Sequence, residues 1–129
     1  GINVAFGHDC VLDPWYALGS HDMLEVAGIG LHVAQMTGVS EMQAAFDAVT
    51  SNAAKVMNLP DYGLAPGCNA DMVVLQAGDP VEALRLRANR LYVIRRGRVI
   101  AESSPHEAQV HLMGADTTVK FANSELDTP

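Results

Sequence analysis

Apolar residues open the chain in a short run that lacks the alternation of a half-exposed strand. Residues 2–7, read as INVAFG, are apolar apart from Asn3 and close with a glycine. This pattern is typical of a short strand buried on both faces, as in a sheet that helices cover on each side. Because such a strand needs a neighbour to pair with, we expect the chain to be the end of something larger.

Three segments with helical periodicity follow a loop over residues 8–20. The first helix is predicted to have Asp22 as its N-cap and to end at Gly38. The second begins at the capping box SEMQ of residues 40–43, in which the hydroxyl and the glutamine satisfy backbone groups of the first turn. A short third helix is expected to end near Asn58.

From residue 61 onward the period changes from helical to strand-like, and glycine and proline become frequent. Arg96-Gly97 separates two apolar runs in the manner of a β-hairpin. A helical turn is expected at residues 81–87. Strands are predicted at residues 72–75, 91–95, 98–101 and 108–113.

This order of elements predicts an α/β fold with three parts. Residues 1–60 have the order of the last β/α unit and closing helices of a barrel, and residues 61–113 form a small β module. Residues 114–129 are polar and are expected to form a tail or a last loose strand.

The charge of the chain disfavours two classes of partner. Eight basic residues stand against fifteen acidic ones, which gives a formal net charge of -7, so we expect binding neither to nucleic acid nor to a membrane. Cys10 and Cys68 are far apart and show no metal-binding spacing. With no signal-peptide pattern either, we expect a cytoplasmic protein.

Asp9 is the first candidate for chemistry, because it follows the predicted strand and Gly7. In a (β/α)8 barrel the carboxyl ends of the strands build the active site. A carboxylate there can ligate a divalent metal and take a proton from metal-bound water. Taken alone, the local pattern favours a carboxylate that caps a turn or pairs with a cation.

Two further candidates flank Asp9. Trp15, in the DPW turn, could wall a pocket for a flat ring or cover the core. Cys10 could face the same pocket or be a small buried residue. His8 points away from Asp9 if the strand continues, so we expect it to pack or to support the site.

Several motifs together resemble the bacterial cytosine deaminases of the amidohydrolase superfamily. FGHD at residues 6–9 and DPWY at residues 13–16, followed by Gly19, are similar to the last barrel strand and loop of that family. The segments TSNAAK, GLAPGCNADMVVL and VIRRGRVI resemble the closing pattern of the wider superfamily. The resemblance runs from residue 1 to about residue 113.

The resemblance implies a metal-dependent (β/α)8 barrel with a small β-sandwich made from both chain ends. It implies one Fe or Zn ion and hydrolytic deamination of cytosine or a related amino-substituted heterocycle. By the resemblance, Asp9 binds the metal and shuttles protons, while Trp15 and Cys10 lie at the substrate. The family has an aspartate where this chain has Cys10, and a neutral side chain removes a hydrogen-bond acceptor there.

The remaining metal ligands of the family have no counterpart in these residues. We therefore expect the chain to need a missing N-terminal barrel portion, to retain no metal alone, and to be inactive in isolation. An uncovered strand edge and helix faces predict a homo-oligomer. Two alternatives stay open: a non-catalytic α+β binding or oligomerisation module, and another amidohydrolase such as a ring-opening hydrolase.

Overall fold

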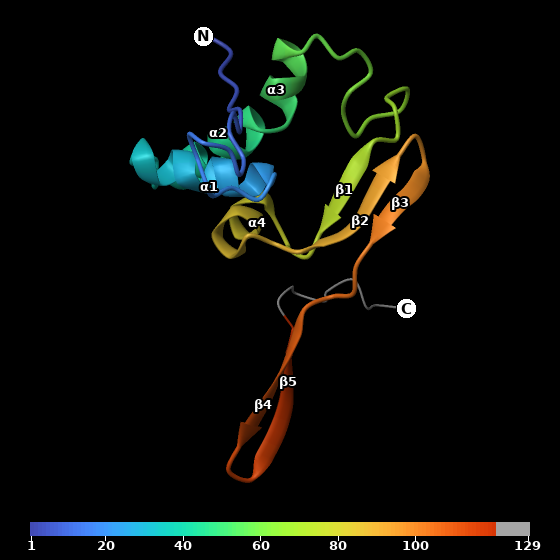
Figure 1. Ribbon diagram of the computed structural model, residues 1–129. Coiled ribbons are helices and arrows are strands. Elements are labelled where there is room, and N and C mark those ends of the chain that lie inside the picture. Colours follow the sequence, from blue (N-terminus) through green and yellow to red (C-terminus); the bar gives the residue numbers. More distant parts are fainter. Residues whose placement is uncertain (121–129) are drawn as a thin grey trace.

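The structure is a computed structural model that describes residues 1–120. Four helices gather beside a three-stranded sheet, and a two-stranded hairpin projects away from both (Figure 1). This α/β arrangement agrees with the predicted fold class. The elements in chain order are α1 (Met23–Val33), α2 (Val39–Ala48), α3 (Ser51–Val56), β1 (Met72–Leu75), α4 (Pro80–Leu86), β2 (Arg90–Arg95), β3 (Arg98–Glu102), β4 (Glu107–Leu112) and β5 (Ala115–Lys120). Within this described part, no helix is long and apolar enough to cross a membrane.

The strand predicted at residues 2–7 is absent, since no helix or strand includes residues 1–10. A strand exists only through hydrogen bonds to a neighbour, and none of the strands in residues 1–120 pairs with this segment. Its contacts are instead with the helices. The backbone N–H of Phe6 donates to the carbonyl of Ala48 at 3.0 Å, and the Asn3 side chain donates to the carbonyl of Asn52.

Helix α1 begins as predicted, because the Asp22 carboxylate accepts from the Leu24 N–H at 2.7 Å. It ends at Val33, earlier than the predicted stop at Gly38. The physical reason lies in Gln35, whose φ of 56° is left-handed and cannot continue a right-handed helix.

Helix α2 begins at Val39, one residue before the predicted cap Ser40. The cap is Gly38, whose N–H donates to the Glu41 carboxylate at 2.8 Å, so the predicted capping box was wrong in register. The short third helix is confirmed as α3, which begins at Ser51 and ends at Val56, two residues before Asn58.

The sheet contains the predicted strands in the antiparallel order β1-β2-β3. Arg96 and Gly97 join β2 to β3 with φ values of 49° and 74°, the left-handed conformations that tight hairpins require. The predicted helical turn is confirmed as α4, which connects β1 to β2.

The second hairpin pairs β4 with β5 and projects away from the other sheet (Figure 1). The prediction of a polar tail from residue 114 was wrong for residues 115–120, which form β5, and the alternative of a last strand is confirmed there. Residues 121–129 of that predicted tail lie outside the described residues.

The core lies between α1, α2 and α4. Small and aliphatic side chains fill it, with Phe6 and Leu75 packed against its edge: Leu24, Ala27, Leu31, Ala45 and Leu84 are the buried members. A Cβ on Gly30 would lie 2.7 Å from the Phe6 ring, so the ring can pack against α1 here because this residue is a glycine. This contact holds the segment that leads to Asp9 against α1.

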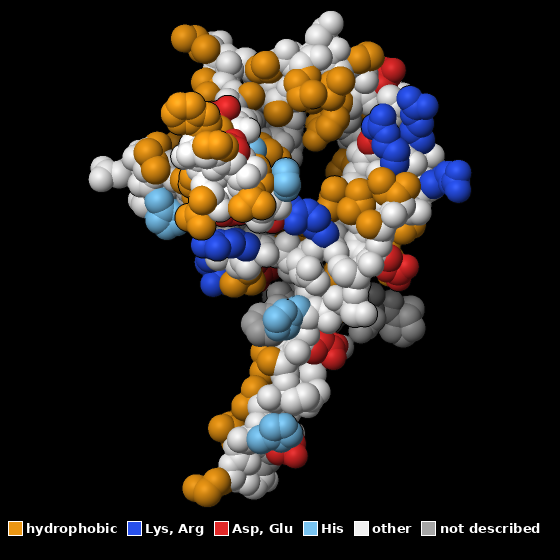
Figure 2. Space-filling view, in the orientation of Figure 1, with side chains coloured by type: hydrophobic (Ala, Val, Ile, Leu, Met, Phe, Trp, Pro, Cys, Tyr) orange, Lys and Arg blue, Asp and Glu red, His pale blue; other side chains and the backbone are white. Residues whose placement is uncertain are grey.

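Many large apolar side chains remain exposed. Figure 2 shows them gathered on the helical part and in a row along one side of the projecting hairpin. Ile2 is 93% exposed, Leu64 83% and Leu112 65%. Surfaces of this kind mark contacts with other protein.

Candidate functional site

Asp9 lies where the segment from Phe6 leaves α1. Its φ of 62° is left-handed, a conformation that aspartate tolerates better than most residues. The residue is exposed. Asp9 therefore lies at the surface, three residues after the ring that packs on Gly30 of α1.

An open hollow of about 410 Å³ lies beside Asp9. The loop after Phe6 forms one side of it and α1 forms the other, and its lining residues are Gly7, His8, Asp9, Cys10, Trp15, Tyr16, Glu25, Val26 and Ile29. The structure thus brings Asp9, Cys10 and Trp15, the three residues selected from the sequence, to one hollow.

The turn around Asp13 holds Trp15 at this hollow. One oxygen of the Asp13 carboxylate accepts from the N–H groups of Trp15 and Tyr16, both at 2.9 Å. The Asp13 N–H in turn donates to the Tyr16 carbonyl at 3.1 Å. Aspartate before proline sets such turns. The Trp15 residue is 88% exposed, so the alternative that it covers the core is wrong.

The Cys10 thiol is held in its neutral form. A hydrogen bond from the thiol to the Asp13 carboxylate raises the pKa of Cys10 above its ordinary value of 9.0, and partial burial and the charge of Asp9 raise it further. The same hydrogen bond lowers the pKa of Asp13 below 3.8, with the Tyr16 N–H adding to the effect. Cys10 therefore presents an uncharged sulfur to the hollow and not a nucleophilic thiolate.

His8 also borders the hollow. Its Nδ1 lies 3.0 Å from the Cys10 carbonyl oxygen, to which it donates when that nitrogen carries the proton. Gly19 lies against the other side of the ring, where a Cβ would come within 2.6 Å of the imidazole. His8 supports the backbone of the loop through these contacts.

These residues do not complete a metal site. Nowhere in the described part of the chain do three side chains of His, Cys, Asp or Glu gather closely enough to hold an ion. Asp9 offers one carboxylate oxygen ligand of the kind that Fe and Zn accept.

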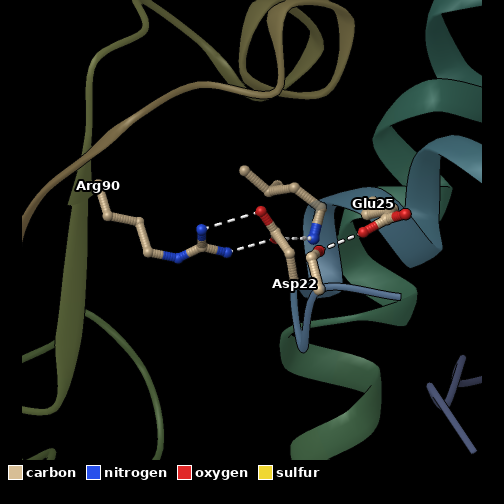
Figure 3. A network of polar contacts seen from close by, with 5 residues as sticks. Asp22, Glu25 and Arg90 are labelled. Carbon is tan, nitrogen blue, oxygen red and sulfur yellow. Dashed lines mark hydrogen bonds and ion pairs between the residues drawn. The ribbon is translucent and has the colours of Figure 1, made fainter. Parts of the chain in front are cut away.

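A polar network around Asp22 was not predicted from the sequence (Figure 3). Arg90 of β2 forms a two-pronged ion pair with Asp22, and the Ser20 hydroxyl donates to the carboxylate of Glu25, which lines the hollow. The cap at Asp22 has a local signal in the sequence. Arg90, the ion-pair partner of Asp22, is 68 residues away, and no local pattern connects the two. Tyr16 was also missed, although it follows Trp15 directly.

Comparisons with known proteins identify the family of this chain. The model of the amidohydrolase family matches residues 1–101. The chain is 32% identical to N-isopropylammelide isopropyl amidohydrolase of Pseudomonas sp. (strain ADP), covering 79% of this chain and 26% of that protein. It is 31% identical to the pterin deaminase of Rhizobium rhizogenes (strain K84 / ATCC BAA-868), covering 81% and 24%.

A solved structure is similar as well. The 5-methylcytosine deaminase from Klebsiella pneumoniae, liganded with phosphonocytosine, superimposes with a TM-score of 0.77 and 42% identity, over 81% of this chain and 26% of that one. The chain thus spans about a quarter of the length of the relatives it matches. The family match over most of the chain establishes that it belongs to the amidohydrolase family.

Proposed function

We propose that this chain is the C-terminal part of a metal-dependent (β/α)8 amidohydrolase that hydrolytically deaminates cytosine or a related amino-substituted heterocycle. Residues 1–60 would close the barrel and residues 61–113 would form part of its small β-sandwich. One observation carries the proposal: Asp9, Cys10 and Trp15 border the same hollow. Both cysteines are free of disulfide bonds, which is consistent with a cytoplasmic protein.

Asp9 is the proposed metal ligand and proton carrier. Its exposed carboxylate at a hollow favours this function, whereas a buried, ion-paired Asp9 would have favoured a non-catalytic module. When bound, one Fe or Zn ion would supply an activated water. Asp9 would take a proton and hold it near the ring that loses ammonia.

Among the heterocycles, we favour 5-methylcytosine. The most informative relative is a 5-methylcytosine deaminase, 42% identical over the shared region. The neutral sulfur of Cys10 can lie against a methyl group without losing hydration. A carboxylate at the same place would lose hydration. The exposed face of Trp15 can stack on a flat ring.

A chimera tests the proposal. This chain would replace the aligned segment of the Klebsiella pneumoniae enzyme, and ammonia release would be measured with cytosine and 5-methylcytosine. We expect activity in the chimera and a loss of about a hundredfold or more with Asp9→Asn. Asp61→Asn is the matched control, because Asp61 is also exposed and left-handed, with a φ of 56°. Equal activity of both variants would contradict the proposal.

The isolated chain gives a second test. We expect the 13.7 kDa species to contain no stoichiometric metal and to release no ammonia from either substrate. Bound Fe or Zn with turnover at that mass would show that a complete site forms without the missing ligands.

A further inference from the structure

The Arg90 side chain joins the sheet to the helix that forms one side of the hollow. Its Nη1 donates to Asp22 Oδ2 at 2.9 Å, and its Nη2 donates to Oδ1 of the same carboxylate. The Arg90 side chain is 39% exposed and that of Asp22 20% exposed. Two parallel charge-assisted hydrogen bonds fix both distance and orientation.

This pair has a particular place in the fold. The other two ion pairs of the described residues lie within the sheet, Arg95 with Asp71, and within the projecting hairpin, His111 with Asp116. Among the ion pairs of residues 1–120, only that of Arg90 and Asp22 joins a strand to the helical part. The Ser103 hydroxyl donates to the Arg90 carbonyl, so the sheet also holds the backbone at this end.

The neighbours of Asp22 contact residues that line the hollow. Gly19 lies against the His8 ring, and the ring centroids of His8 and His21 are 6.3 Å apart. Ser20 donates to Glu25, a lining residue. A shift of Asp22 would therefore move the surface on which His8 and the adjoining Asp9 rest.

We propose that Arg90, acting through Asp22, is a positioning residue that fixes the segment of residues 19–25, on which His8 packs, and with it the place of Asp9. The consequence for catalysis rests on the proposed function. The structural part does not, because it concerns the order of the loop in this chain alone.

Two variants separate the ion pair from the helix cap. Asp22→Asn keeps an oxygen that can accept from the Leu24 N–H but removes the charge. Arg90→Lys keeps the charge but cannot form the two-pronged contact. Arg95→Lys is the matched control, since it weakens the comparable pair within the sheet and leaves the helical part untouched.

Amide hydrogen exchange of the purified chain, followed by mass spectrometry of the peptide covering residues 8–22, provides the readout. The N–H groups of Leu12 and Asp13 donate to the carbonyls of Leu18 and Tyr16 and report the order of the loop. We expect exchange roughly tenfold faster in Asp22→Asn and Arg90→Lys, with Arg95→Lys unchanged there. Unchanged exchange in the first two variants, or equal acceleration in all three, would overturn the proposal.

The catalytic consequence is measured in the chimera described above. We expect Arg90→Lys to lower kcat more than it alters KM, because a misplaced Asp9 affects chemistry more than binding. An inactive parent chimera would defeat the proposed function while leaving the exchange result to decide the role of Arg90. An active chimera with unaltered kcat in Arg90→Lys would instead defeat the positioning of Asp9.

Discussion

The ring of Phe6 lies against the backbone of Gly30, at a point of α1 where any Cβ would come within 2.7 Å of it. Gly28, one half-turn away, has open space around its Cα. These two glycines of one helix therefore allow a matched comparison. The first is required by packing, and the second only lowers the helix propensity.

We expect Gly30→Ala to destabilise the chain by about 1–2 kcal/mol, because overpacking displaces Phe6 and outweighs the gain in helix propensity. Gly28→Ala should stabilise it by about 0.5–1 kcal/mol. Urea unfolding measures both. A stabilising Gly30→Ala would mean that the ring moves aside freely and does not anchor the segment before Asp9.

The ion pair of Asp22 and Arg90 predicts a pH dependence of stability. The hydrogen bond from Arg90 is the main cause that lowers the pKa of Asp22 below 3.8, and the Leu24 N–H adds to it. A lowered folded-state pKa contributes stability above the unfolded value, and this contribution disappears as the pH falls through the folded-state pKa.

The free energy of unfolding of the original chain should therefore exceed that of Asp22→Asn by about 1 kcal/mol at pH 6, a modest value because solvent screens the partly exposed arginine. The difference should shrink as the pH falls below 3.8. Urea titrations at several pH values measure it. A difference that stays constant down to pH 2 would show that the charge of Asp22 contributes nothing.

Much of this fold could be predicted because it depends on residues adjacent in the sequence. Features that depend on pairing between distant segments could not be predicted in this way. The cap at Asp22 and the turn at Arg96-Gly97 depend on a few adjacent residues, so both were predicted correctly. The strand at residues 2–7 failed because an apolar run becomes a strand only beside a partner. Of the site, Asp9 and Trp15 were candidates from the local pattern and received their expected roles from the resemblance, whereas Arg90 depends on a contact across 68 residues.

The projecting hairpin has one apolar face and one polar face. On the polar face Gln109 hydrogen-bonds to Thr118 at 2.8 Å, and His111 contacts Asp116 at 3.1 Å. The opposite face carries Val110, and its apolar row is visible in Figure 2. An isolated two-stranded hairpin is marginal in water, so this face gains most from being covered.

We therefore expect the isolated chain to self-associate through this face. Val110→Lys should shift sedimentation toward the monomer, because a charge there opposes burial. Gln109→Lys, which places the same side chain on the polar face, is the control and should leave association unchanged. A monomeric original chain, or equal effects of both variants, would contradict this expectation.

The hydrogen bond from Cys10 to Asp13 predicts slow alkylation of this thiol. Because it raises the pKa of Cys10, little thiolate exists at neutral pH. Asp13→Asn removes the charged acceptor yet keeps an oxygen for the N–H groups of Trp15 and Tyr16. Iodoacetamide labelling of Cys10, read by mass spectrometry relative to Cys68 in the same sample, should therefore accelerate several-fold in this variant. An unchanged ratio would mean that Asp13 does not hold the thiol proton.

Substrate preference gives the sharpest test of the hollow itself. Cys10→Asp in the chimera would place a carboxylate where the neutral sulfur now lies, and a 5-methyl group would remove water from that charge. We expect the ratio of kcat/KM for 5-methylcytosine to that for cytosine to fall by roughly tenfold to a hundredfold, the range that one methyl group commonly decides. Cys10→Ser stays neutral and can still donate to Asp13, so it should keep the original preference. If Cys10→Asp leaves the ratio unchanged while activity persists, Cys10 does not face the ring, and the substrate lies along another side of the hollow.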